Sequence, residues 1–282
     1  MELGLSSCGK PMNEDTFRSY IQNGIKHMEI SPQEAVYDNF DYRNAEKLAK
    51  QFGINLWSYH LQFSPFKKID ISSPDEALRK STIEILTEQM KKAADIGIDK
   101  FIIHASGETI ANEERHVHME KAKESLKELA ENAASLGGVI AVEDLPRSCL
   151  GNCSDDILEL ISVDDRLKVC FDTNHLLKQD NCEFIKAVGD KLITTHISDF
   201  DFINERHWLP GEGKIDWQAL ISTLHKVNYN GVWLYEIRFK CPKTIYRRDL
   251  TCEDFARNYN ELMNNKTPTI FSTHKENLGM WE

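Results

Sequence analysis

Three carboxylates and one imidazole stand at the ends of four short apolar runs in the second half of the chain. They are Glu143, Asp172, His196 and Glu236, and their runs cover residues 139–143, 168–172, 192–196 and 232–237. If these runs are parallel strands of one barrel, all four side chains meet at the same mouth. Three carboxylates cannot share a small space unless a cation neutralises them or their pKa values separate. The pattern predicts one divalent metal ion, and this residue set suits Mn²⁺, Mg²⁺, Co²⁺ or Zn²⁺. The alternative to a metal site is a network of polar side chains with a structural role.

These runs belong to a longer alternation of apolar strands and amphipathic helices. We expect eight strands, at residues 3–7, 27–30, 54–59, 100–105, 139–143, 168–172, 192–196 and 232–237. Helices are expected at residues 14–22, 42–52, 75–96, 113–136, 155–161, 182–188, 217–227 and 253–263. Continuous apolar strands between amphipathic helices are typical of a parallel sheet covered by helices. Eight such units without a linker predict an α/β fold, the (β/α)8 TIM barrel.

The chain is expected to form a single domain with a short C-terminal extension. Its 282 residues suit one barrel, and no Pro/Gly/Ser-rich linker divides them. The alternating pattern stops near residue 264, so we expect a barrel over residues 1–264 and a polar tail over 265–282. The tail, which contains Trp281, is expected to pack on the barrel or on a neighbouring subunit, which leaves a homo-oligomer open.

Composition narrows the classes of partner. The net charge of −11 repels polyanions, which makes nucleic acid an unfavourable main partner and leaves small sugars compatible. No apolar stretch reaches the roughly 20 residues that span a membrane, and the N-terminus does not resemble a secretory signal. Seven scattered cysteines are typical of thiols in a reducing compartment, so we expect a cytoplasmic protein.

Histidines and acids near the strand ends are further site candidates. His60 directly follows the third run and His104 lies in the fourth, and both fit pocket lining, core packing or metal ligation. His175 is expected to contact the substrate, to bind a second metal ion or to have a structural role. Asp199 is expected to orient the imidazole of His196 or to contact the substrate. Glu29 is expected to be a polar residue of the barrel wall.

The loop at residues 205–217 is the most distinctive local string. The guanidinium group of Arg206 could donate paired hydrogen bonds to hydroxyls or to a carboxylate. The flat apolar ring of Trp208 could stack on a sugar ring. The other interpretation is an ordinary barrel loop whose arginine pairs with surface acids. Further along the chain, Arg247 and Arg248 are expected to be a solvated basic pair; the alternatives are binding of a phosphate or of a neighbouring subunit.

Together these motifs resemble the xylose-isomerase-like TIM-barrel superfamily, most closely its sugar-phosphate isomerase/epimerase and ketose 3-epimerase group. The resemblance rests on the strand-terminal glutamates, Asp172-x-x-His175, His196-x-x-Asp199 and the Arg206-His-x-x-Pro-Gly-x-Gly loop. It covers the whole barrel, with specific motifs only in the second half. The resemblance implies that the quartet binds the metal and that Glu143 and Glu236 also accept and donate a proton. It implies that His175 and Arg206 hold substrate hydroxyls, and that His60 and His104 line the pocket.

The leading hypothesis is a metal-dependent isomerase or epimerase that acts on a ketose or related polyol-ketone by proton transfer through an enediolate. The same groups could dehydrate a keto-inositol. The superfamily also contains apurinic-site endonucleases with three zinc ions. Extra ligands for such a site would come from His60, His104, His175, Glu205 and His207, with Glu205 where that family has Asp. This alternative predicts a zinc phosphodiester hydrolase that acts at abasic DNA.

Overall fold

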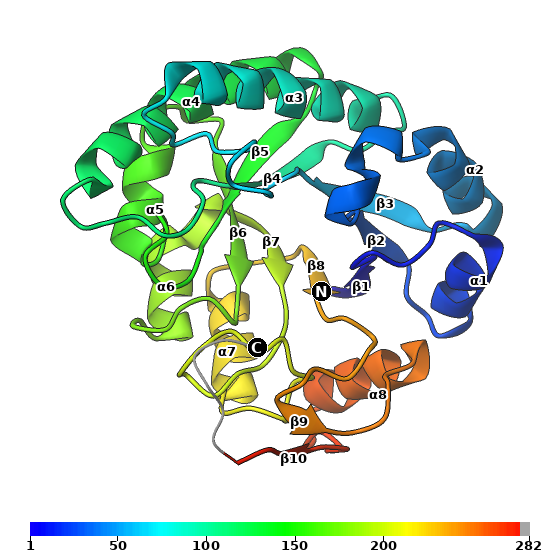
Figure 1. Cartoon of the computed structure of the whole chain (residues 1–282). Helices are drawn as coiled ribbons and strands as arrows, with labels where there is room; N and C mark the ends of the chain where they lie inside the picture. The colour runs from blue at the N-terminus through cyan, green and yellow to red at the C-terminus, as the bar shows by residue number, and fades with distance from the viewer. Residues whose placement is uncertain (277–282) are drawn as a thin grey trace.

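The computed structural model describes residues 1–276 and has the predicted barrel (Figure 1). The strands are β1 (Glu2–Ser6), β2 (His27–Ile30), β3 (Asn55–His60), β4 (Lys100–His104), β5 (Val139–Glu143), β6 (Lys168–Asp172), β7 (Leu192–His196) and β8 (Val232–Tyr235). All pair in parallel, in the order β7-β6-β5-β4-β3-β2-β1-β8. Backbone hydrogen bonds of Ile197 with Leu234 and Glu236 join the two ends of this sheet and close the barrel.

Helices form the outer ring (Figure 1). They are α1 (Glu14–Gln22), α2 (Tyr42–Phe52), α3 (Glu76–Ala94), α4 (Arg115–Ser135), α5 (Ser154–Ile161), α6 (Asn181–Val188), α7 (Trp217–Lys226) and α8 (Cys252–Met263), with 3-10 turns η1 (Glu34–Asn39) and η2 (Gly189–Lys191). Side chains of Asp41, Asp75 and Asp216 cap three helix starts by accepting backbone N–H bonds. Gly53 has φ 68° just after α2, where glycine turns the chain toward β3 without strain.

The main core lies between the strands and the helices, and a small second cluster fills the inside of the barrel. The inner cluster contains Ile102, Ala141 and Cys170, so the lower barrel is packed and not a pore. Polar strand-terminal residues lie above it, at the end where the strands point. No helix among the described residues is long and apolar enough to cross a membrane. The seven cysteines are all described, and none forms a disulfide there.

The described part of the tail packs against the barrel instead of projecting from it. β10 (Thr273–His274) pairs antiparallel with β9 (Ile245–Tyr246), a short strand in the loop after β8. The His274 ring stacks on Trp208 at 4.4 Å between centroids and hydrogen-bonds the Glu212 carbonyl. The tail therefore covers the loop between β7 and α7. Trp281, for which packing was also expected, lies outside the described residues.

We expect the variant His274→Ala to loosen this cover. Loss of the ring stack and the hydrogen bond should lower the free energy of unfolding by about 1 kcal/mol, since the ring is partly exposed. Urea denaturation of the purified variant would measure the change. Ile270→Ala, which alters an exposed tail residue, is the control; an equal loss in both variants would contradict a specific contact.

Candidate active site

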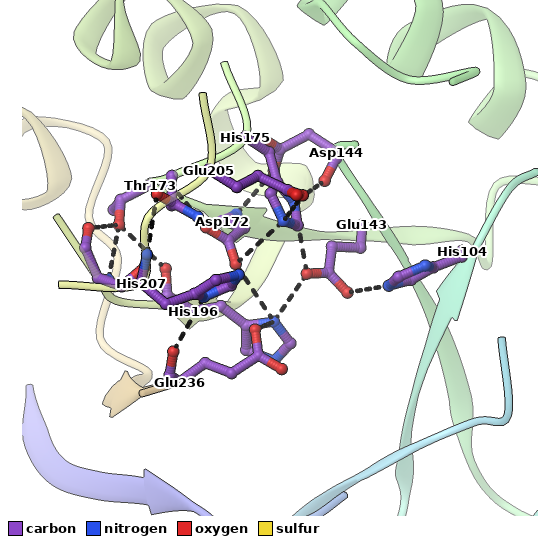
Figure 2. Close-up of polar contacts among 12 residues, drawn as sticks. His104, Glu143, Asp144, Asp172, Thr173, His175, His196, Glu205, His207 and Glu236 are labelled. Atoms are coloured by element: carbon purple, nitrogen blue, oxygen red, sulfur yellow. Dashed lines mark hydrogen bonds and ion pairs between the residues drawn. The ribbon is translucent and has the colours of Figure 1, made fainter. Parts of the chain in front are cut away.

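The four strand-terminal residues of the predicted metal site converge at one end of the barrel (Figure 2). His196 Nδ1 lies 2.9 Å from Glu143 Oε1, 3.1 Å from Glu236 Oε2 and 4.0 Å from Asp172 Oδ2. One ligand-type atom from each residue lies within 4.8 Å of those of the other three. Glu143, Asp172 and His196 are buried, while the Glu236 side chain keeps 17% of its surface exposed toward the mouth. The structure therefore brings together the four residues that the sequence grouped.

The spacing of these atoms fits a divalent ion. An octahedral ion with bonds of about 2.1 Å holds adjacent ligand atoms about 3.0 Å apart and opposite ones about 4.2 Å apart. The distances around His196 Nδ1 fall in that range. Asp172 Oδ2 is buried and accepts no hydrogen bond among the described residues, a costly state for a carboxylate oxygen. A cation would supply the missing partner.

Glu29, at the end of β2, fixes the orientation of His196. Its Oε2 lies 3.0 Å from His196 Nε2 and accepts a 2.8 Å hydrogen bond from Ser58 Oγ. A proton held on Nε2 leaves the Nδ1 lone pair free for a cation, which is a common arrangement around metal-binding histidines. The sequence analysis placed Glu29 only in the barrel wall. The feature of the sequence that could have indicated this role is an acidic residue within an otherwise apolar strand.

The variant Glu29→Gln should weaken cation binding about 10- to 100-fold, because the amide no longer fixes the imidazole tautomer. Isothermal titration with Mn²⁺ would measure the affinity. The control is Glu46→Gln, which changes a surface acid on α2. Unchanged affinity in Glu29→Gln would contradict the orienting role.

Four further ligand groups overlap or adjoin the quartet among the described residues, and two of them extend the site to either side. His60 Nε2 and His104 Nε2 lie 3.2 and 3.3 Å from Glu143 Oε2, so Glu143 belongs to this group as well as to the quartet. On the other side, His175 Nε2 lies 3.2 Å from Glu205 Oε1, and these two residues form a third group with His207. The structure thus places the additional histidines named in the sequence analysis next to the quartet.

Burial and mutual charges shift the pKa values of the site residues. Burial, partly offset by the charge of His175, raises the pKa of Asp172 to about 8. Burial acts in the same direction on Glu143 and Glu236, but the neighbouring histidines, His196 foremost, outweigh it and lower both pKa values. Burial lowers the pKa of His60, but the hydrogen bond and charge of Glu143 raise it to about 9. The two glutamates are therefore ionised, whereas Asp172 holds a proton near neutral pH.

We expect cation binding to release protons at pH 7. Asp172 must lose its proton to become a ligand, and so must His196: burial lowers the pKa of His196, but the charges around it raise that pKa well above its usual value. Affinity should therefore rise with pH and fall by more than about tenfold per unit below pH 8. Titrations at pH 7 in two buffers of different ionisation enthalpy would count the released protons. In Asp172→Asn that count should decrease by about one, and an equal count in both proteins would contradict the assignment.

Arg206 and Trp208 both have buried side chains in the loop between β7 and α7. The Arg206 side chain is buried, and its Nε donates a 2.9 Å bond to Asp201. Trp208 is fully buried under His274, and its indole N–H donates to Thr244. Neither side chain presents the surface expected for sugar binding, because the tail and the loop interior cover them. The two side chains instead pack the interior of this loop.

Asp199 does not orient His196, so that expectation is wrong. Its Oδ2 accepts hydrogen bonds from Gly211 N at 2.8 Å and Trp217 Nε1 at 2.9 Å, which close the loop before α7. A Cβ on Gly213 would lie 2.2 Å from Asp199 Oδ1, so the loop requires glycine there. Asp199 therefore shapes the loop that carries Glu205 and His207.

Two other residues at the mouth were missed by the sequence analysis. Arg147, in the loop after β5, lies 2.9 Å from Glu205 Oε2 and also binds Glu108. The Phe63 ring stacks on His104 at 4.4 Å between centroids and forms an apolar wall beside the acids. Neither follows a strand directly, so residue spacing gave no signal for them.

Fold and site together define a (β/α)8 barrel with a carboxylate–histidine cluster at the ends of its strands. The chain belongs to the xylose isomerase-like TIM barrel family, whose model matches residues 17–254.

Comparisons with individual proteins give two kinds of relative. A probable endonuclease 4 of Finegoldia magna is 28% identical over 278 residues, which cover 90% of this chain and 92% of the relative. A fructoselysine 3-epimerase of Escherichia coli O157:H7 is 26% identical over 172 residues, or 58% of this chain and 61% of the relative. The crystal structure of a D-tagatose 3-epimerase-like protein superposes with a TM-score of 0.79, at 20% identity, over 94% of this chain and 96% of that protein. At that identity the structural likeness shows the fold.

Proposed function

We propose that this protein is a divalent-metal-dependent isomerase or epimerase of a ketose or related polyol-ketone. The observation that carries the proposal is the placement of two ionised glutamates, Glu143 and Glu236, at the same nitrogen of His196. They come from β5 and the end of β8 and approach the cluster from different sides (Figure 2). Relatedness to a fructoselysine 3-epimerase and the fold shared with a D-tagatose 3-epimerase-like protein support it.

The cation would be held by Glu143, Asp172, His196 and Glu236. When bound, it would polarise the substrate carbonyl and stabilise negative charge on that oxygen. One glutamate takes the proton from the carbon beside the carbonyl, and the other returns a proton. Return to the same carbon from the opposite face gives an epimer, and return to the carbonyl carbon gives an isomer.

The surroundings of the two glutamates suit proton transfer. His60 Nε2 and His104 Nε2 lie within ion-pair distance of Glu143 Oε2, on the side of the carboxylate away from His196. Glu236 is the more exposed of the pair, so substrate reaches it from the mouth. The Phe63 ring, stacked on His104, provides an apolar face on one side of the site.

A screen of ketoses in D₂O tests the proposal. Protein loaded with Mn²⁺ or Mg²⁺ is incubated with unphosphorylated and phosphorylated ketoses, and deuterium incorporation is followed by proton NMR. At least one ketose should exchange the hydrogen beside its carbonyl. Absence of exchange with every ketose, in protein that holds its metal, would refute the proposed activity.

A second candidate is a phosphodiester hydrolase with more than one metal ion. The adjoining ligand groups favour it, since Glu143 belongs to three of them, and the likeness to a probable endonuclease 4 supports it. Arg147 already neutralises Glu205 in the third group, which weakens the case for an ion there. Two measurements distinguish the hydrolase from the isomerase: the number of metal ions bound after loading with zinc, and cleavage of a DNA duplex that contains an abasic site. About three bound zinc ions and cleavage would favour the hydrolase, whereas one ion and ketose exchange would favour the isomerase.

A further inference from the structure

The carboxylate of Glu205 has a different partner at each of its two oxygens. Its Oε1 lies 3.2 Å from His175 Nε2, within the third ligand group, which consists of His175, Glu205 and His207 (Figure 2). Its Oε2 lies 2.9 Å from Arg147 Nη1. The one acid of this ligand group is therefore already paired with a cation that belongs to the protein.

Arg147 is held in place by contacts with two other loops and with its own. Its Nε and Nη2 donate to the two carboxylate oxygens of Glu108 at 2.5 and 2.8 Å, and its Nη1 donates to Asn204 Oδ1 at 2.8 Å. Its carbonyl oxygen accepts a 2.7 Å hydrogen bond from Asn152. Glu108, Arg147 and Glu205 belong to the loops after β4, β5 and β7. Since only 16% of its side chain is exposed, the guanidinium group cannot move aside without losing these bonds.

Other basic side chains do not have such a partner. Within residues 1–276, Arg147 is the one arginine or lysine that forms an ion pair with a member of the metal-ligand groups. Arg247 is buried on Glu212 and Arg248 binds Asp254, so the expected solvated basic pair does not form. In the same part of the chain, the acids of the quartet form ion pairs with histidines alone.

A divalent ion in the third group would have to share Glu205 with the guanidinium group. The ion would bind Oε1 while Arg147 holds Oε2, so two cations would lie on the two oxygens of one carboxylate. Their repulsion is strong in a partly buried site, because little water screens it. Glu108 and Glu205 would together face three positive charges, whereas the three carboxylates of the quartet would face only the two charges of one ion. The third group is therefore the less favourable place for an ion.

We propose that Arg147 serves as a built-in cation that keeps a second divalent ion out of the third group. Two imidazoles and a carboxylate would otherwise suit Zn²⁺ or Co²⁺. The inference rests on the metal site of the proposed function, but not on its ketose chemistry. Enzymes that hydrolyse phosphodiesters with several ions use neighbouring ions to stabilise both the attacking and the leaving oxygen. By removing one neighbouring ion, Arg147 directs the barrel toward chemistry that needs a single ion.

The test counts zinc ions in wild-type protein and in Arg147→Gln, which removes the charge but keeps hydrogen-bonding groups. Metal-free protein is titrated with Zn²⁺ by calorimetry, and bound zinc is counted by mass spectrometry after gel filtration. Arg147→Gln should bind one ion more than wild type, with an affinity for that ion about 100-fold above the wild-type value. The double variant Arg147→Gln/His207→Ala should lose the additional ion, which would assign that ion to the third group.

Two controls distinguish the effect of charge from a change of structure. Arg147→Lys keeps the positive charge and should bind the same number of ions as wild type. Arg166→Gln removes a paired arginine that precedes β6, at the opposite end of the barrel, and should leave the number unchanged. An additional ion in Arg147→Lys, or equal numbers in wild type and Arg147→Gln, would overturn the inference.

If circular dichroism shows that Arg147→Gln is unfolded, the comparison of wild type with His207→Ala decides. Equal numbers of bound zinc ions in these two proteins support the inference, because the third group of the wild type is then empty. Loss of one ion in His207→Ala overturns it.

Deuterium exchange into ketoses separates this inference from the proposed function. If Arg147→Gln gains an ion but no ketose exchanges its hydrogen in the wild-type protein, the role of Arg147 stands and the isomerase activity fails. If a ketose exchanges its hydrogen but the third group of the wild type holds an ion, the activity stands and the inference fails.

Discussion

Glu143→Gln and Glu236→Gln should each reduce solvent-deuterium exchange into a good ketose substrate by about 10²- to 10⁴-fold. The amide keeps an oxygen near the cation but cannot accept the transferred proton, which is the usual magnitude for loss of a general acid or base. Proton NMR in D₂O measures the rate directly, and metal analysis of each variant excludes simple loss of the ion.

The two variants should also differ in which epimer of the substrate still exchanges its hydrogen. In an epimerase each glutamate serves one face of the substrate, so one variant can still exchange a hydrogen with one epimer while conversion stops. Glu120→Gln, on the surface of α4, is the control. Wild-type exchange rates in both site variants would remove the two glutamates from the mechanism.

Removal of the cation should abolish exchange and lower the melting temperature. A ligand present at a thousand times its Kd stabilises the folded state by about 4 kcal/mol. For a chain of this size that corresponds to a shift on the order of 10 °C. Three carboxylates held close together without a cation add repulsion in the same direction.

Calorimetry after dialysis against a chelator would measure this shift, and addition of Mn²⁺ should restore both melting temperature and exchange. The variant Asp172→Asn, which removes one buried carboxylate, should show a smaller difference between its metal-free and metal-loaded forms. If the chelated wild-type protein keeps its melting temperature and its exchange rate, the quartet is a structural network and not a metal site.

The sequence predicted the elements that position the quartet because local patterns determine them. Each of Glu143, Asp172, His196 and Glu236 ends or directly follows an apolar strand, and parallel strands in a barrel end at the same face. Helix boundaries were less exact: α3 ends at Ala94 and not at residue 96, since a turn and Gly97 precede β4. Such shifts did not move any site residue.

Other features depended on contacts between distant residues, which spacing does not encode. Glu29 and His196 are 167 positions apart, so their hydrogen bond left no local signal. Trp208 looked like an exposed ring in an open loop, but the distant His274 covers it. Asp199 looked like a partner of His196 because they are three residues apart, yet its side chain turns to the loop before α7.

The packing of β10 also has a consequence for the order of events during synthesis. His274 and Pro268 contact Trp208 and Gly211, in the loop that carries Glu205 and His207. These tail residues leave the ribosome after all eight strands and the last barrel helix. The loop that carries Glu205 and His207 therefore obtains part of its packing only after the segment that follows α8 has been synthesised.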